Sequence, residues 1–189
     1  MWGFMRNLAE KLAENHDLND EEMLSLLSTA EYDTELFERA DGIRRKIYGC
    51  GVYIRGLIEF TNYCKNNCFY CGIRRDNKNA ERYRLSREEI LECCREGYVL
   101  GFRTFVLQGG EDGSFTDDVM CGIISDIRAK FPDCAITLSL GERSRSSFER
   151  MKNAGADRYL LRHEAASQEL YSKLHPSEMS LENRKNCLF

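Results

Sequence analysis

Four short apolar runs alternate with helix-type segments from residue 52 onward, and this alternation limits the possible folds more than any other feature of the sequence. Each run is rich in β-branched or aromatic residues, and each is followed by apolar residues at helical spacing. Strict alternation predicts an α/β fold of parallel βα repeats, in which helices cover a parallel sheet. An open doubly wound sheet and a partial TIM-type (βα) barrel both fit. The predicted strands are residues 52–60, 103–108, 135–140 and 158–162.

The predicted helices carry start and stop signals. Ser86 and Glu89 form a capping box that opens one helix, and Gly101 ends it. Five apolar side chains of the next helix are expected to point inward: Val119, Met120, Ile123, Ile124 and Ile127. Shorter helices are predicted for residues 146–155, 167–175 and 180–189.

Residues 1–50 are predicted to form an N-terminal helical extension. One helix of this extension follows the cap-type and acidic residues 19–22, and a further one has a possible cap at Thr34 and ends at Gly49. The first of these helices is expected to bury a broad apolar face made of Met23, Leu24, Leu26 and Leu27.

Composition argues against several classes of protein. The net charge of −4 gives no basic field for nucleic acid. No run approaches eighteen consecutive apolar residues, so no membrane span is expected. The first seventeen residues mix acids and bases without the apolar core of a secretory signal, which favours a cytoplasmic location where thiols stay reduced.

Polar residues follow each predicted strand at the point where it ends. Three cysteines come after the first strand, the sequence GGED after the second, GERS after the third and HE after the fourth. Because the carboxyl ends of parallel strands meet at one edge of a sheet or barrel, these groups are expected to converge. The sequence therefore predicts a functional site at that edge.

The three cysteines are Cys64, Cys68 and Cys71, which lie within one loop. Thiolates are soft ligands that suit both zinc and iron–sulfur clusters, but a structural zinc site needs a fourth ligand. A 4Fe–4S cluster usually takes four cysteines, so a cluster held by three leaves one iron open to bind a small molecule. A zinc site that borrows Cys50 or a histidine is the alternative.

At these residues the sequence resembles the radical S-adenosylmethionine (SAM) enzymes. The resemblance rests on the C-x3-C-x2-C spacing, with an aromatic residue, Tyr70, before the last cysteine, and on the Gly109-Gly110-Glu111 triplet after the second strand. It implies a 4Fe–4S cluster whose open iron chelates SAM. It further implies reductive cleavage of SAM to methionine and a 5′-deoxyadenosyl radical, with no catalytic residue expected beyond the cluster cysteines.

A finer resemblance is to the FeFe-hydrogenase maturases related to biotin synthase and methylornithine synthase. It is carried by the stretches FTNYCKNNCFYCGIRRDNKNAERYR, VLQGGED, TLSLGE, GADRYLLRHE and ENRKNCL. The SAM contacts that it implies are Tyr70, Gly110, Glu111, Ser139, Glu164 and Arg184. The substrate-side residues that it implies are Arg55, Gln108, Thr137 and Arg158.

The residues themselves leave some of these roles open. Arg55 and Arg158 fall within predicted apolar strands, where a buried arginine needs either an anionic ligand or an internal ion pair. Thr137 and Ser139 alternate with apolar neighbours, so one face of that strand is polar, as a face that looks into a site would be. Gln108 fits a hydrogen-bonding role or a cap of the next turn. Arg184, read alone, is a solvated residue.

The resemblance also sets expectations for the whole protein. A full barrel has about eight strands, so residues 51–189, with about four βα units, would be the N-terminal half of a truncated radical SAM barrel. The implied role is assembly of the dithiomethylamine-bridged diiron centre of FeFe-hydrogenase, on a small-molecule or small iron–sulfur precursor. An electron donor such as ferredoxin or flavodoxin and other hydrogenase maturases are the implied partners. The alternatives are a methylornithine-synthase-like or biotin-synthase-like enzyme, and a non-catalytic iron–sulfur or zinc-binding module.

Overall fold

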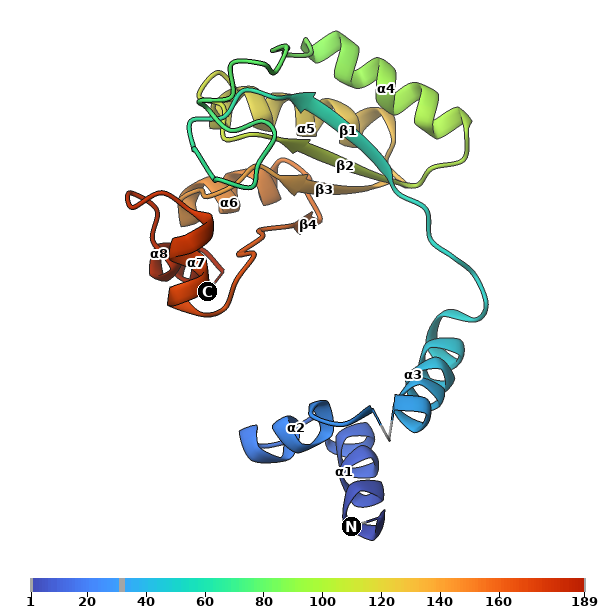
Figure 1. The fold of residues 1–189 in the computed structure, drawn as a ribbon. Coiled ribbons are helices and arrows are strands. Elements are labelled where there is room, and N and C mark those ends of the chain that lie inside the picture. The colour runs from blue at the N-terminus through green and yellow to red at the C-terminus, as the bar shows by residue number, and fades with distance from the viewer. Residues whose placement is uncertain (1, 31–32, 189) are drawn as a thin grey trace. The chain divides into compact units, whose positions relative to one another are not determined.

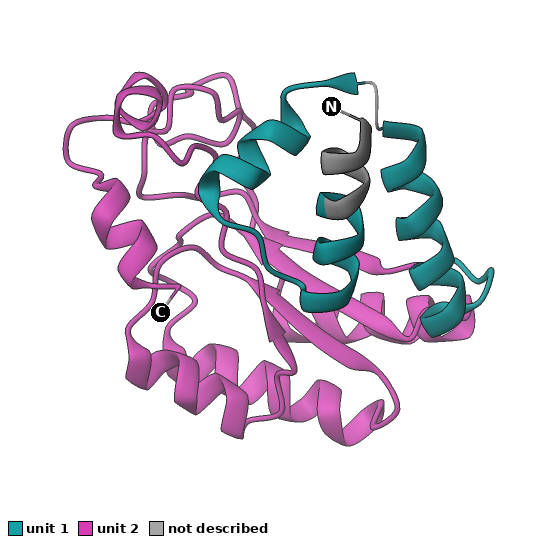
Figure 2. Cartoon of the chain, turned by 90° about the horizontal axis from the view of Figure 1, so that it is seen from below, with its two compact units in different colours: residues 1–53 teal, residues 54–189 magenta. Residues whose placement is uncertain are grey.

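The structure is a computed structural model that describes residues 2–30 and 33–188, with side chains described from Leu8 onward. The chain forms two compact units, residues 1–53 and residues 54–189 (Figure 2). Among the described residues, no helix combines the length and the apolar character needed to cross a membrane.

The first unit contains the helices α1 (Trp2–Asn15), α2 (Asp20–Leu27) and α3 (Asp33–Tyr48). Leu8 and Leu26 form its small core, against which Leu18 and Leu36 pack. The prediction that α2 buries a broad apolar face is mostly wrong, because Leu24 and Leu27 are exposed and Leu26 alone of the predicted four is buried. The predicted cap at Thr34 is also wrong, since α3 already begins at Asp33.

The second unit contains a four-stranded parallel sheet in the order β1-β2-β3-β4 (Figure 1). The strands are β1 (Gly56–Thr61), β2 (Thr104–Gly109), β3 (Ala135–Ser139) and β4 (Arg158–Tyr159). The parallel α/β prediction is confirmed. Two strand boundaries differ from the prediction: residues 52–55 are exposed and lie outside β1, and only two residues of the predicted strand 158–162 are paired.

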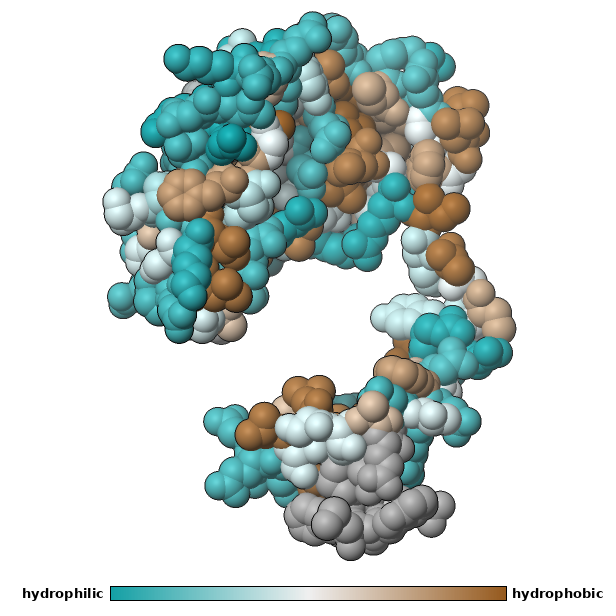
Figure 3. All heavy atoms as spheres, in the orientation of Figure 1, coloured by the Kyte–Doolittle hydropathy of each residue, from teal (hydrophilic) through white to brown (hydrophobic). Residues whose placement is uncertain are grey.

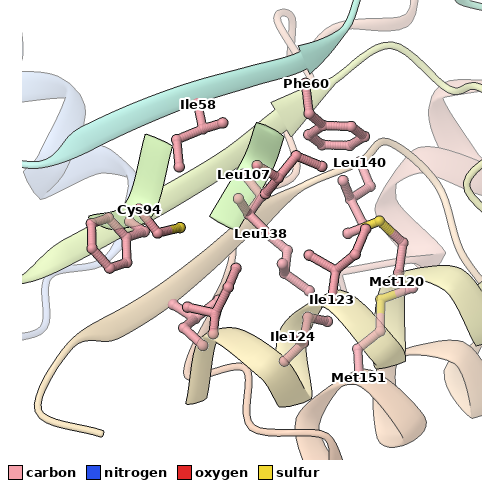
Figure 4. Close-up of a cluster of buried hydrophobic side chains, with 14 of the residues drawn as sticks. Ile58, Phe60, Cys94, Leu107, Met120, Ile123, Ile124, Leu138, Leu140 and Met151 are labelled. Atoms are coloured by element: carbon pink, nitrogen blue, oxygen red, sulfur yellow. The ribbon is translucent and has the colours of Figure 1, made fainter. Parts of the chain in front are cut away.

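Three helices cover one face of this sheet: α4 (Arg87–Val99), α5 (Asp117–Lys130) and α6 (Arg145–Asn153). The core lies between the sheet and these helices (Figure 4). Ile58, Leu107 and Leu138 enter it from the strands and Ile123 from α5, and all are almost fully buried. Val119 was predicted to point inward but is 43% exposed, because it lies on the outer side of α5.

The other face of the sheet carries the alternate residues of each strand. There Leu57 and Leu160 stay exposed, and Figure 3 shows hydrophobic side chains on the visible face of this unit. Beyond β4 the short helices α7 (Gln168–Leu174) and α8 (Leu181–Asn186) have a small core of their own, built from Ala165, Tyr171 and Leu181.

Candidate functional site

The three cysteines lie in a loop, residues 62–84, that leaves the carboxyl end of β1, as predicted. All three side chains are partly buried. The loop closes on itself through backbone hydrogen bonds, with the Cys71 N–H donating to the Cys68 carbonyl at 3.1 Å and the Arg75 N–H to the Asn66 carbonyl at 2.8 Å. It is therefore a folded loop with little regular secondary structure.

One arginine holds much of this cysteine loop together. The guanidinium of Arg82 donates to the carbonyl oxygens of Asn62, of Ile73 at 2.9 Å, of Arg74 at 2.7 Å and of Asn77 at 3.1 Å. Only the planar fork of arginine presents enough donors for such a set. The sequence gives no sign of this role, because a loop arginine usually looks solvated.

The end of the loop is fastened to the segment after β2. Asp112 is buried and accepts hydrogen bonds from Arg84 at 2.6 and 3.0 Å, from the Thr61 hydroxyl at 2.8 Å and from the Ser114 N–H at 3.0 Å. Burial opposes ionisation of the carboxyl, but the hydrogen bonds from Arg84, Ser114 and Thr61 outweigh it and lower the pKa of Asp112 to about 2.

The Gly-Gly-Glu triplet packs directly on the first cysteine. The Glu111 N–H points at Cys64 Sγ at 3.4 Å, and the Lys65 N–H donates to the Glu111 carbonyl at 3.0 Å. Gly110 has no room for a side chain, because a Cβ there would lie 2.7 Å from Cys64 Cβ and closer still to the Tyr63 carbonyl oxygen. The two loops therefore meet backbone to backbone, which only glycine permits.

The Glu111 carboxylate joins four segments of the chain. It accepts a hydrogen bond from the Glu142 N–H at 3.1 Å, and it forms ion pairs with Lys65 at 3.1 Å and with Arg184 at 3.8 Å. It fills the space that a side chain at Gly141 would need, and Gly141 has a φ of +75°. Glu111 thus links the loops after β1, β2 and β3 to α8.

Arg184 is buried, so reading it as solvated is wrong. Helix α8 brings its guanidinium to two carboxylates, with Nε 2.9 Å from Glu142 Oε1 in addition to the Glu111 contact. Burial works against the charged form, but Glu142, Tyr171 and Glu111 together raise the pKa of Arg184. The long-range packing of α8 that causes this burial has no signal in the local sequence.

A pocket of about 530 Å³ opens at the carboxyl ends of the strands. Its lining brings together Cys71 and five of the predicted site residues: Tyr70, Gln108, Ser139, Glu164 and Arg184. Glu164 adopts a φ of +61°, an uncommon backbone conformation for a residue with a side chain. The convergence that the strand-end pattern predicted is therefore present, although the individual roles remain predictions.

The predicted substrate-side residues are more dispersed. Arg55 lies outside β1 and Arg158 lies in β4, and both are exposed, so the premise that these arginines are buried is wrong. Thr137, the neighbour of Arg158 in the sheet register, is buried, and its hydroxyl has no hydrogen-bond partner among the described residues. Gln108 Nε2 lies 3.5 Å from Glu59 Oε1, at the limit of a hydrogen bond.

Cys64, Cys68 and Cys71 lie on one loop, and their thiols are soft donors of the kind that holds iron–sulfur clusters. Among the described residues, no three His, Cys, Asp or Glu side chains converge as they would around one metal ion. Burial raises the pKa of Cys68, and the nearby thiols of Cys64 and Cys71 add to that shift. A bound metal cluster would favour the thiolates instead.

Residues 58–188 match the family model described as the radical SAM superfamily. The chain belongs to this superfamily. Radical SAM proteins are enzymes that use a 4Fe–4S cluster and SAM, so the family resemblance seen in the sequence is confirmed.

Three relatives show where the chain lies within the superfamily. It is 48% identical to the FeFe hydrogenase maturase subunit HydE of Thermotoga maritima, over 97% of this chain and 52% of that protein. It is 32% identical to 3-methylornithine synthase of Methanosarcina acetivorans, over 94% of this chain and 51% of the relative. The crystal structure of a methylornithine synthase superposes with a TM-score of 0.81 at 28% identity, over 96% of this chain and 54% of that one.

The chain spans about half the length of these relatives. The solved relatives are radical SAM enzymes with TIM-type barrels, so the four-stranded parallel sheet corresponds to part of such a barrel.

Proposed function

We propose that this chain binds a 4Fe–4S cluster through Cys64, Cys68 and Cys71 and serves as a radical SAM enzyme in assembly of the FeFe-hydrogenase active-site cofactor. The observation that carries the proposal is the 48% identity to the HydE maturase over 97% of the chain, which includes the whole cysteine loop. When bound, the cluster supplies the electron that cleaves SAM to a 5′-deoxyadenosyl radical.

Different pocket residues would contact different parts of SAM. Arg184 is charged and lies at the pocket wall, where it would meet the carboxylate of SAM, and Glu164 would accept hydrogen bonds from the polar groups of SAM. Tyr70 and Ser139 also line the pocket and would contact the adenosyl part. Gly110 and Glu111 pack on Cys64 and would meet the methionine amino group at the adjacent edge.

The substrate would lie deeper, over the open face of the sheet, near the four residues Arg55, Gln108, Thr137 and Arg158. The Thr137 hydroxyl lies beside Arg158 and has no hydrogen-bond partner among the residues that the structure describes. This supports a polar or anionic precursor, because one acceptor could satisfy both groups. We propose a small-molecule or small iron–sulfur substrate, a ferredoxin- or flavodoxin-type electron donor, contacts with other hydrogenase maturases and a cytoplasmic location.

The test is anaerobic reconstitution of the chain with iron and sulfide, followed by dithionite and SAM. We expect about four irons per chain, the absorption of a 4Fe–4S cluster, and 5′-deoxyadenosine as product. Replacing Cys64, Cys68 or Cys71 with alanine should abolish cluster loading. The matched control is Cys94→Ala, a buried core cysteine whose loss should leave the iron content unchanged. Equal loss of iron from both groups, or one zinc and no cluster absorption, would contradict the proposal.

A second candidate is an enzyme with a methylornithine-synthase-like substrate. Methylornithine synthases match 94% of the chain in sequence and 96% in structure. Product analysis separates the two candidates: conversion of a free amino acid to a rearranged carbon skeleton would favour this one.

A further inference from the structure

We infer that His175 is a positioning residue that fixes the orientation of Tyr70 at the edge of the cluster-binding loop. The inference deepens the proposed function and rests on it for the role of Tyr70 as a SAM contact. His175 is buried and belongs neither to the sequence motifs nor to the proposed SAM contacts.

The segment from α7 to α8 packs against the outer turn of the cysteine loop. The Phe69 N–H donates to the Leu174 carbonyl at 2.9 Å, and Cys68 Sγ lies 3.7 Å from Met179 Sδ. These contacts lie on either side of His175 along the chain. The turn that carries Cys68 and Tyr70 is therefore held by the segment in which His175 lies.

His175 itself is rigidly placed. Its side chain is almost fully buried, and its ring stacks on Tyr171 with centroids 3.9 Å apart and an interplanar angle of 16°. Its Nδ1 lies 2.9 Å from the Tyr171 carbonyl oxygen. A carbonyl can only accept, so the proton of the neutral ring lies on Nδ1, and Nε2 is left as an acceptor.

The Tyr70 hydroxyl meets that acceptor. The distance between Tyr70 Oη and His175 Nε2 is 3.3 Å, and the two rings stand edge to face with centroids 5.4 Å apart. Tyr70 is half-exposed and lines the pocket, and its hydroxyl also interacts with the Cys68 thiol, so the bond to His175 is the contact that ties the ring to the segment from α7 to α8. The hydrogen bond turns the hydroxyl toward His175 and keeps the exposed part of the ring at the pocket wall.

The hydrogen bond can be tested in the metal-free chain. The chain has three histidines, and the other two, His16 and His163, are exposed. Long-range 1H–15N spectra should show His175 protonated on Nδ1, and Tyr70→Phe should move its Nε2 signal alone. An Nε2-protonated His175, or a signal unmoved by Tyr70→Phe, would overturn the inference.

The functional arm uses the cluster-loaded chain and measures SAM affinity from the change that SAM causes in the cluster's electron paramagnetic resonance signal. His175→Phe keeps the aromatic stack but removes the acceptor, and it should weaken SAM binding about three- to tenfold. Tyr70→Phe and the double variant should each match His175→Phe. His175→Gln, which returns an acceptor near the position of Nε2, should restore the affinity. Lys173→Gln, an exposed change on α7, is the control.

These outcomes separate the two ideas. A wild-type chain whose cluster signal ignores SAM contradicts the proposed function, and the spectra of the metal-free chain then decide whether His175 fixes Tyr70. Effects of His175→Phe and Tyr70→Phe that simply add, or a His175→Phe chain that binds SAM like the wild type, would refute the positioning role. Melting temperatures of all variants identify a variant that has failed to fold.

Discussion

Replacing Gly110 with alanine should separate the two loops that meet at the proposed cluster site. The added methyl group would lie 2.7 Å from Cys64 Cβ and closer still to the Tyr63 carbonyl oxygen, whereas real Cβ atoms essentially never come within 3.0 Å of such neighbours. The loops after β1 and β2 must therefore part by about 1 Å to reach van der Waals contact.

The cost of this movement can be estimated from its neighbours. Overpacking costs about 1–3 kcal/mol, and the upper half of that range applies because the obstacle is backbone and cannot rotate away. Parting the loops also strains the contacts of Glu111 with Cys64 and Lys65. We expect a melting temperature lower by roughly 5–10 °C, since about 1 kcal/mol corresponds to roughly 2–4 °C in a chain of this size.

Thermal unfolding followed by circular dichroism measures this shift, and iron content after reconstitution measures the effect on the site. Gly113→Ala is the matched control, because it lies in the same loop and a Cβ there meets no atom within 4 Å. Its effect should stay within about 0.5 kcal/mol. If Gly110→Ala has the same melting temperature as Gly113→Ala and binds as much iron, the close approach of the two loops is not what requires glycine.

Three further predictions follow from the same structure. Because the pKa of Asp112 is lowered to about 2, its stabilising effect is complete above about pH 4 and is lost as the pH falls through 2. Asp112→Asn should therefore lower the free energy of unfolding by roughly 1–2 kcal/mol at neutral pH and make that free energy depend less on pH between 4 and 2. A variant whose stability falls with pH like that of the wild type would contradict this. Arg82→Lys cannot reach four carbonyl oxygens, so it should speed hydrogen exchange in the cysteine loop, while Arg95→Lys, at an exposed arginine of α4 that pairs with Glu92, should not. Leu107→Ala should cost about 2–5 kcal/mol in denaturant unfolding against less than about 1 for the half-exposed Leu57→Ala, and equal costs would mean that the core lies elsewhere.

Much of the fold could be predicted because its signals are local. The capping box at Ser86 and Glu89 and the alternation of Thr137 and Ser139 with apolar residues depend on neighbours within a few positions, and both are present in the structure. Residues 52–55 have the composition of a strand, but they pair with no strand in the described part of the chain, so β-propensity alone placed the start of β1 too early.

The candidate site was predictable to a lesser extent for a physical reason. The cysteine spacing and the Gly-Gly-Glu triplet are contiguous motifs, and the structure places them together. Arg184 and His175 act through contacts with residues about 40 to 105 positions earlier, and these contacts exist only once the tertiary structure has formed. Arg82 is closer in sequence, but its carbonyl partners depend on the path of an irregular loop that no periodicity describes.

The sequential order of the strands has a consequence for how the protein is made. Each strand pairs with the one before it, so the sheet can grow unit by unit as the chain leaves the ribosome, with little loop-closure entropy at each step. Cys64 can contact the Gly-Gly-Glu segment as soon as β2 has paired with β1. The contacts of Tyr70 with His175 and of Glu111 with Arg184 form only after the fourth unit has folded. The cysteine loop thus takes its final form only after the segment from α7 to α8 has been synthesised and has folded against it.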